Sequence, residues 1–248
     1  MHSNKKKIAL LKSSKCGLTA GFTLVEMSIV IVIIGLLVAG ILVGRDMVKS
    51  AELNSTVSKA MQYSNIAQLF RDKYNAFPGD MFDAEDKFGA GLTDNGNGNG
   101  RIEGVSEIGQ AWVHLSLSGL IKDEFDGSST FTGPIVSGGN VPSASMNKAV
   151  FLLTSELDDG TSTVPHIGLG KISGTVANFG AFISPARAYV VDKKIDDGKP
   201  ATGDVHSENG SSATGTCVTI NVVGREYTLN NNEVACKMRF YILTQSNK

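Results

Sequence analysis

The start of the chain separates into a polar leader and a long apolar run. Residues 22–43 contain one ionisable side chain, Glu26, and the next charged residue is Arg45. At the helical rise these 22 residues reach roughly 33 Å, which is enough to cross the hydrocarbon core of a bilayer. The pattern therefore predicts a transmembrane helix. It also predicts a role for Glu26, because a carboxylate in such a segment is costly unless it has a partner.

The same helix is expected to continue beyond the span. After Gly44 no glycine or proline occurs before Pro78, and apolar or small residues recur every three or four positions. This face consists of Leu53, Val57, Ala60, Ser64, Ala67, Phe70 and Tyr74. We therefore expect one helix from Phe22 to Tyr74, in which residues 22–43 cross the membrane and residues 44–74 pack against a sheet.

Residues 75–248 have the pattern of one globular α+β domain with loops rich in Gly, Ser and Asn. A turn is expected at 75–80, a helix over 106–118 that Ser106 caps, and another helix that begins at Ser184-Pro185. Strands are expected at 149–153, 176–183, 217–223 and 236–243. The last two are expected to be tied together in an antiparallel sheet. The predicted fold class is thus a long N-terminal helix packed on an antiparallel sheet.

The leader, residues 1–21, is basic. It contains Lys5, Lys6, Lys7, Lys12 and Lys15 and no acid. Positive charge before a first span holds that end in the cytoplasm, so the chain after residue 43 is expected on the outer side of the membrane. The small residues at 19–21 precede the apolar run, whereas a secretory signal is cut after it. Lipidation at Cys16 is rejected, because only the short apolar stretch 8–11 precedes it.

These features together resemble the prepilin signature of type IV pilins and type II secretion pseudopilins. The signature is the sequence Gly21-Phe22-Thr23-Leu24-Val25-Glu26, between a basic leader and an unbroken apolar helix. The resemblance implies a prepilin peptidase and methyltransferase that cuts between Gly21 and Phe22, removes residues 1–21 and methylates the new Phe22 amine. It further implies a pilin-like fold. Assembly would join like subunits or other pilins through their apolar helices, at an assembly platform in the inner membrane.

The position of Glu26 has a physical explanation of its own. Cleavage would create an amine at Phe22, whose ordinary pKa is about 7.7 to 8.0. Glu26 lies one helical turn further on, where it can pair with this cation and complement the positive end of the helix dipole. In a filament the amine of an incoming subunit could instead pair with the Glu26 of a neighbour. We therefore expect Glu26 to act in assembly and Gly21 to be required for cleavage.

Composition supports an exported protein. Without its five leader lysines the chain has 18 basic and 24 acidic residues, and this acidic balance argues against nucleic-acid binding by the folded domain. Cys16 leaves with the leader, so Cys217 and Cys236 remain as an even pair in an oxidising compartment. A disulfide between them is expected. The alternative is a pair of free, buried thiols.

Residues 94–103 form a second distinctive segment, in which Asn and Gly alternate. Such a segment offers short oxygen ligands on a backbone that can adopt positive φ, which suits calcium. The candidate ligands are Asp94, Asn95, Asn97, Asn99 and Glu103. The register departs from the standard calcium loop, which would place its bidentate acid at Ser106. The alternative is a flexible Asn/Gly turn.

Enzymatic chemistry is not indicated. His2, His114, His166 and His206 have no zinc-binding spacing, and there is no nucleophile elbow or phosphate loop. The paired acids at 158–159 and 196–197 each precede a glycine and are interpreted as turns. We therefore expect a structural subunit of a type IV pilus or a type II secretion-like pseudopilus. The alternative is a cleaved, membrane-anchored periplasmic binding module that does not polymerise.

Overall fold

The computed structural model describes residues 21–125, 141–156, 162–172, 179–211, 213–222 and 224–242. Cys16 and the paired acids at 158–159 lie outside these residues. The chain divides into two compact units, Met1–Met47 and Val48–Lys248, and each is described by itself. Helix α1 (Leu24–Tyr74) contains the boundary between them.

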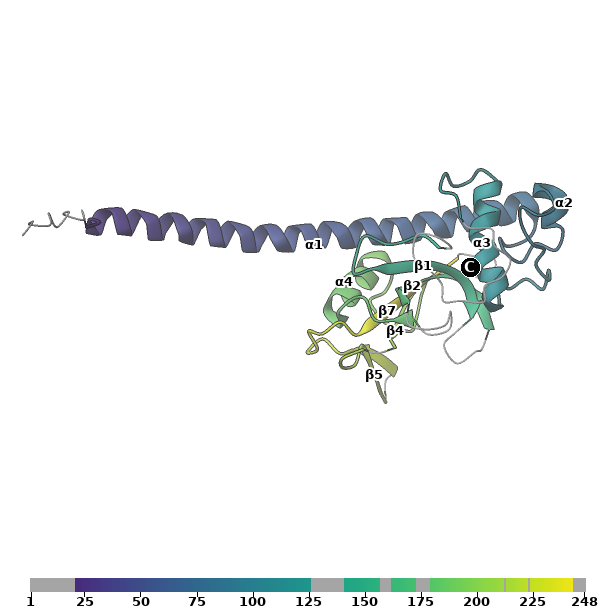
Figure 1. Ribbon diagram of the computed structural model, residues 1–248. Coiled ribbons are helices and arrows are strands. Elements are labelled where there is room, and N and C mark those ends of the chain that lie inside the picture. The colour runs from purple at the N-terminus through teal and green to yellow at the C-terminus, as the bar shows by residue number, and fades with distance from the viewer. Residues whose placement is uncertain are drawn as a thin grey trace, which may run out of the picture. The chain divides into compact units, whose positions relative to one another are not determined.

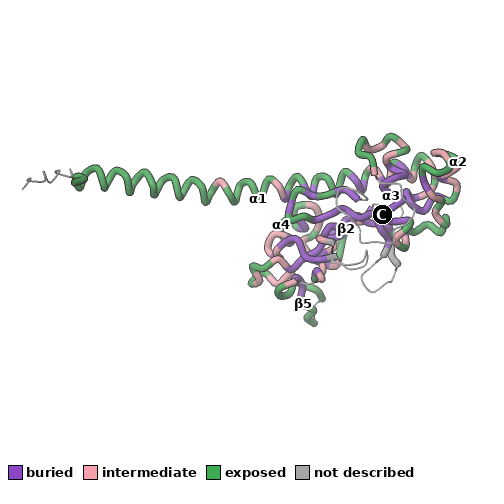
Figure 2. Tube along the Cα trace, in the orientation of Figure 1, coloured by how far each residue is buried: buried purple, intermediate pink, exposed green. Residues whose placement is uncertain are grey.

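The part of α1 in the first unit exposes its apolar side chains throughout. Leu24 is 91% exposed and Leu36 is 70% exposed, and Figure 2 shows most of this stretch as exposed. The helix is long and apolar enough to span a membrane, as a single-pass anchor would be. Apolar side chains in such a density are stable in lipid or against other apolar helices.

The part of α1 in the second unit buries the face that its sequence pattern predicts, except that Tyr74 is only partly buried. The buried members are Leu53, Thr56, Val57, Ala60, Tyr63, Ser64, Ala67 and Phe70. The ring of Tyr63 meets Trp112 edge-on at 4.9 Å and Phe151 at 5.1 Å. Trp112 belongs to α3 (Gly104–Leu117) and Phe151 to β1 (Ala149–Glu156), so this aromatic cluster joins α1, α3 and the sheet into one core.

The main sheet is antiparallel. Its strands follow the order β1, β2 (Ser162–Ile172), β7 (Cys236–Tyr241) and β4 (Val205–Asn209), and the short β3 (Phe179–Gly180) pairs with the end of β2 (Figure 1). One row across the four long strands contains Leu153, Ile167, Phe240 and Val205, and all four are buried. This row lies on the same sheet face as Phe151, because residues two apart on a strand share a face.

The final strands correct the sequence prediction. Residues 217–223 and 236–243 do not lie side by side: β5 (Val218–Asn221) pairs with β6 (Gly224–Tyr227) in a separate two-stranded sheet, while β7 lies between β2 and β4. Strands β2, β4 and β6 were not expected. Within 176–183 the described residues contain only the short β3, and residues 173–178 lie outside the description.

Two of the short helices were expected, one of them with a different start, and a third was not. Helix α4 (Pro185–Ile195) follows Ser184 with proline in its first turn, and α2 (Ala84–Phe88) is a further short helix. Helix α3 begins before Ser106, which therefore does not cap it: the N-cap is Glu103. The Glu103 N–H donates to the carboxylate of Glu107 at 2.9 Å, so this side chain supplies the acceptor at the helix start.

Candidate functional site

The residues expected to be processed lie just before α1. Gly21, Phe22 and Thr23 precede the first helical residue, and the Phe22 side chain is 79% exposed. The peptide bond expected to be cut is thus in exposed, non-helical backbone, the kind that proteases cleave. A Cβ built at Gly21 would meet no atom within 4 Å, so the fold itself does not require glycine at this position.

Glu26 forms a capping box with Thr23. Its carboxylate accepts hydrogen bonds from the Thr23 N–H at 2.8 Å and the Thr23 hydroxyl at 2.9 Å. The Glu26 N–H donates to the Thr23 hydroxyl oxygen at 3.2 Å. This reciprocal pattern satisfies two amides at the helix start. Thr23 is thus a partner of Glu26 besides the expected Phe22 amine, and the Thr-x-x-Glu spacing is its signal in the sequence.

The Asn/Gly segment is wrapped around two buried carboxylates that the sequence did not single out. Asp80 is 1% exposed and Glu107 is 7% exposed. The Asp80 carboxylate accepts the N–H groups of Asn99 and Gly100, each at 2.9 Å. The Glu107 carboxylate accepts the Asn97 N–H at 3.0 Å. Burial raises the pKa of both carboxyls, and the backbone amides oppose this by stabilising the charged form.

Each candidate calcium ligand accepts a hydrogen bond from a nearby donor. The pairs are Asp94 with the Gln110 side chain, Asn95 with the Glu85 N–H, Asn97 with the Asn99 N–H, Asn99 with the Arg101 N–H, and Glu103 with the Asn99 side chain. These contacts fold the loop upon itself and against α2 and α3. Calcium binding by these residues stays a prediction.

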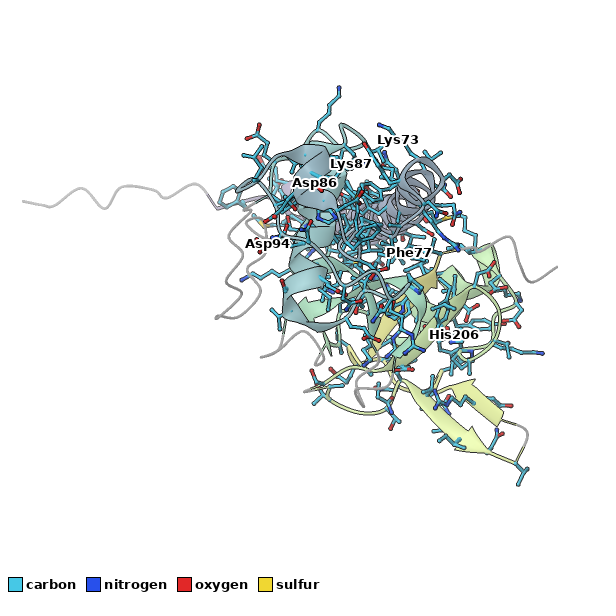
Figure 3. All side chains as sticks on the ribbon, turned by 90° about the vertical axis from the view of Figure 1, so that its right-hand side faces the viewer. Lys73, Phe77, Asp86, Lys87, Asp94 and His206 are labelled. Atoms are coloured by element: carbon cyan, nitrogen blue, oxygen red, sulfur yellow. A yellow bond between two sulfur atoms is a disulfide. The ribbon has the colours of Figure 1, made fainter. Side chains whose placement is uncertain are left out.

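His114 joins the turn after α1 to the same loop. Its Nδ1 accepts the Gly79 N–H at 2.9 Å, and its Nε2 lies 3.2 Å from the Asp94 carbonyl oxygen. Both contacts are satisfied by the neutral ring with its proton on Nε2. Burial lowers the pKa of His114 to about 4. Figure 3 labels Asp94 in this region and His206 apart from it on the sheet.

Gly79 allows this packing because it has no side chain. Its φ is +90°, and a Cβ there would lie 2.2 Å from the Glu107 carbonyl oxygen. No other residue fits such a position. The glycine that the sequence assigned to a simple turn therefore fixes how closely the turn approaches α3.

Three acids gather at the end of α4. Carboxylate oxygens of Asp192, Asp196 and Asp197 lie within 4.8 Å of one another. Among the described residues this is the one such cluster that could hold a metal ion. Asp192 accepts hydrogen bonds from the Tyr227 hydroxyl at 2.5 Å and the Gly198 N–H at 3.0 Å. Burial raises the pKa of Asp192 to about 6. The acids at 196–197 form the turn that the sequence predicts.

The disulfide between Cys217 and Cys236 is present as expected. Cys217 immediately precedes β5, and Cys236 is the first residue of β7. The bond therefore ties the two-stranded sheet to the main sheet, rather than one strand to its neighbour.

Comparison of the chain with protein-family models, with curated proteins and with solved structures gave no match. The class of this protein is defined by its architecture: it is an α+β chain with a long, apolar N-terminal helix and an antiparallel sheet. This arrangement is compatible with a pilin-like protein.

Proposed function

We propose that this protein is a structural subunit of a type IV pilus or a type II secretion-like pseudopilus. It is exported as a prepilin, cut after Gly21 by a prepilin peptidase, methylated at Phe22 and assembled through α1. The observation that carries the proposal is the start of α1. An accessible Gly21-Phe22 bond precedes an exposed apolar helix whose only acid before residue 45 is Glu26.

The exposed apolar part of α1 supports assembly as well as anchoring. Before assembly, lipid of the inner membrane covers these side chains, and in a filament the same side chains of like subunits or other pilins replace the lipid. The Val48–Lys248 unit then lies on the periplasmic or extracellular side. The assembly platform in the inner membrane is the partner that would move subunits from one environment to the other.

The role of Glu26 distinguishes the two candidate functions, a filament subunit and a membrane-anchored binding module. A module that never polymerises gains nothing from an acid in its span beyond a helix cap. In a filament the Phe22 amine of one subunit and the Glu26 of another form an ion pair in an apolar setting, and a misregistered pair leaves both charges unpaired. The charge of Glu26, rather than its capping ability, is then what assembly needs.

Substitution of Glu26 tests this distinction. Glutamine keeps the acceptor that the Thr23 N–H needs, because capping boxes use Glu or Gln alike. We expect E26Q and E26V both to insert and to be cut, and both to lose filaments from sheared surface material. The control is S28V, which removes another polar group of the same apolar run, one that bonds only the Val25 carbonyl oxygen at 2.8 Å. Normal filament levels from E26Q would reject the proposal.

Processing is tested at Gly21. The G21L chain should keep its uncut leader, and mass spectrometry of the wild type should find a chain that starts at methylated Phe22. Because open space surrounds Gly21, leucine there does not disturb α1, and any loss of cleavage belongs to the peptidase. A wild-type chain that is cut but absent from sheared surface material would support the alternative function, a membrane-anchored binding module that does not polymerise.

A further inference from the structure

Four Asn-Gly pairs place a reactive side chain before an unhindered amide: Asn95-Gly96, Asn97-Gly98, Asn99-Gly100 and Asn209-Gly210. In an unfolded chain the glycine nitrogen loses its proton and attacks the Cγ of the asparagine. The new N–C bond closes a succinimide as the side-chain nitrogen leaves as ammonia. One water then opens the ring to aspartate or isoaspartate. Glycine favours this reaction because no Cβ obstructs its nitrogen.

In the folded chain the glycine nitrogen of each pair donates a hydrogen bond. The acceptors are the Met81 carbonyl for Gly96 at 2.8 Å, the Asp80 carbonyl for Gly98 at 2.9 Å, the Asp80 carboxylate for Gly100 at 2.9 Å and the Ala235 carbonyl for Gly210 at 2.9 Å. Each bond retains the proton that the reaction must remove and directs the nitrogen toward its acceptor. The fold therefore holds back the nucleophile at every Asn-Gly pair.

The asparagine side chains of the loop are hydrogen-bonded but accessible. Asn95, Asn97 and Asn99 are exposed, so water reaches them. The side-chain oxygen of Asn99 accepts the Arg101 N–H at 2.8 Å, and such a donor polarises the carbon that is attacked. In the fold, the hydrogen bond of the glycine nitrogen therefore opposes attack of that nitrogen on the asparagine side chain.

The loop cannot avoid this chemistry by using other residues. A Cβ at Gly96 would lie 2.3 Å from the Gly79 carbonyl oxygen, and Gly98 and Gly100 have φ values of +70° and +85°. Asn97 in turn accepts the N–H two residues ahead at 2.9 Å, a turn that short polar side chains stabilise. The local backbone therefore favours glycine at all three loop positions, and Asn97 and Asn99 through the turns that their side chains close.

We propose that the Asp80 carboxylate protects Asn99 from succinimide formation, and that the Asn/Gly loop is a latent deamidation site. Among the three loop acceptors this one belongs to a side chain, so a substitution can remove it; the Asn99 N–H, which the same carboxylate accepts, keeps the Asn97 side chain as acceptor. The backbone carbonyls that bind Gly96 and Gly98 remain in any variant. Deamidation would add a carboxylate to a loop that already encloses Asp80 and Glu107, which further weakens its packing.

The test follows all four asparagines in one sample. The full chain is incubated in detergent at mildly alkaline pH, and peptide mass spectrometry measures deamidation and isoaspartate at each site. We expect D80A to increase the rate at Asn99 by about tenfold or more, the factor that one charge-assisted hydrogen bond is worth. Asn209, whose glycine bonds the distant Ala235, should not change. The control D86A removes a neighbouring exposed acid and should leave every rate at its wild-type value.

A measurement on the wild type keeps the proposal falsifiable if D80A does not fold. Denatured wild-type chain gives the unprotected rate at each site, and hydrogen exchange gives the protection of the Gly100 amide. Deamidation at Asn99 should slow on folding by the same factor as Gly100 exchange. Deamidation of folded wild type at the denatured rate, while Gly100 stays protected, would overturn the proposal. An equal increase at Asn95 and Asn99 in a folded D80A chain would do the same.

Discussion

Single side chains can replace regular secondary structure as acceptors for backbone N–H groups, and three do so here: Asp80, Glu107 and His114. Together they accept backbone N–H groups from the turn after α1 and from the Asn/Gly loop. Buried amides without acceptors are costly, and this segment has no strand or helix to supply them. The sequence could not reveal the arrangement, because Asp80 follows Pro78-Gly79 and resembles an ordinary turn acid.

His114 makes this segment sensitive to acid. Its pKa is lowered to about 4 in the fold, below the ordinary value of 6.5, so the folded chain binds fewer protons than the unfolded chain between these values. Its contribution to stability is complete above pH 6.5 and is lost as the pH falls toward 4. We expect this group to account for on the order of 3 kcal/mol of the stability change between pH 7 and 4.

The variant H114Q isolates that contribution. Glutamine can accept the Gly79 N–H but does not titrate. Burial also lowers the pKa of His166 and His206, and both remain in the variant, so the difference between the two pH profiles belongs to His114. Chemical denaturation of the full chain in detergent, repeated across this pH range, measures it. Parallel profiles for the two chains would show that His114 does not govern acid stability.

At the scale of elements, strand β2 shows why local pattern was a poor guide to the sheet. It contains Pro165, Gly168 and Gly170, residues that interrupt most strands. In the sheet Gly168 lies opposite Arg239, and a glycine within a strand commonly marks a place where other groups approach closely. The partners of β2 are β1, which ends at Glu156, and β7, which begins at Cys236, so the strand is defined by its neighbours in the sheet.

The β5–β6 hairpin is fastened at its base. The Asn209 side chain accepts the Cys217 N–H at 2.7 Å, and the Tyr227 hydroxyl lies 2.9 Å from the Ser207 hydroxyl. The disulfide from Cys217 to Cys236 adds a covalent tie to β7. These contacts explain how a two-stranded sheet, which is marginal alone, is held in the fold.

Loss of the disulfide should therefore destabilise the whole second unit. The loop closed by the bond spans 19 residues in sequence separation, and in the chain-entropy model a loop of this size contributes roughly 3 kcal/mol. We expect the C217A/C236A chain to lose about this much unfolding free energy in denaturant. Reduction of the wild type should produce a similar loss. An unchanged midpoint in both cases would mean that the other hairpin contacts suffice.

At the scale of the whole molecule, the two units differ in what they do with their apolar side chains. The buried residues of the core begin at Leu53, so the described core lies within Val48–Lys248. The part of α1 before this unit instead exposes apolar side chains. The second unit thus contains the described core, while the apolar side chains of the first unit are left uncovered by the chain itself.

A chain that begins at Val48 should keep its fold without detergent. We expect its thermal transition, followed by circular dichroism, to match that of the full chain in detergent, and gel filtration to show a monomer. The full chain without detergent should aggregate through its exposed helix. A truncated chain that has no cooperative transition would show that the first unit contributes to folding.

Features that depend on residues close together in the sequence could be predicted, and features that depend on distant residues could not. The long helix and its buried face depend on periodicity within one segment, so both were readable from the sequence. The capping box of Thr23 and Glu26 is equally local, whereas cleavage after Gly21 stays a prediction. The order of the strands and the contact of Asp80 with Gly100, twenty residues apart, depend on how distant segments meet, and the sequence does not record that.

The hairpin fastened at its base has one more consequence, for the outer surface of the protein. Its far end carries Ile220 and Val222, both almost fully exposed, while Cys217, Asn209 and Tyr227 hold the near end. Sequence at the tip can change without disturbing the buried core. The tip is therefore suited to diverge between related proteins, and to accept an inserted epitope that antibodies can reach while the rest of the domain stays folded.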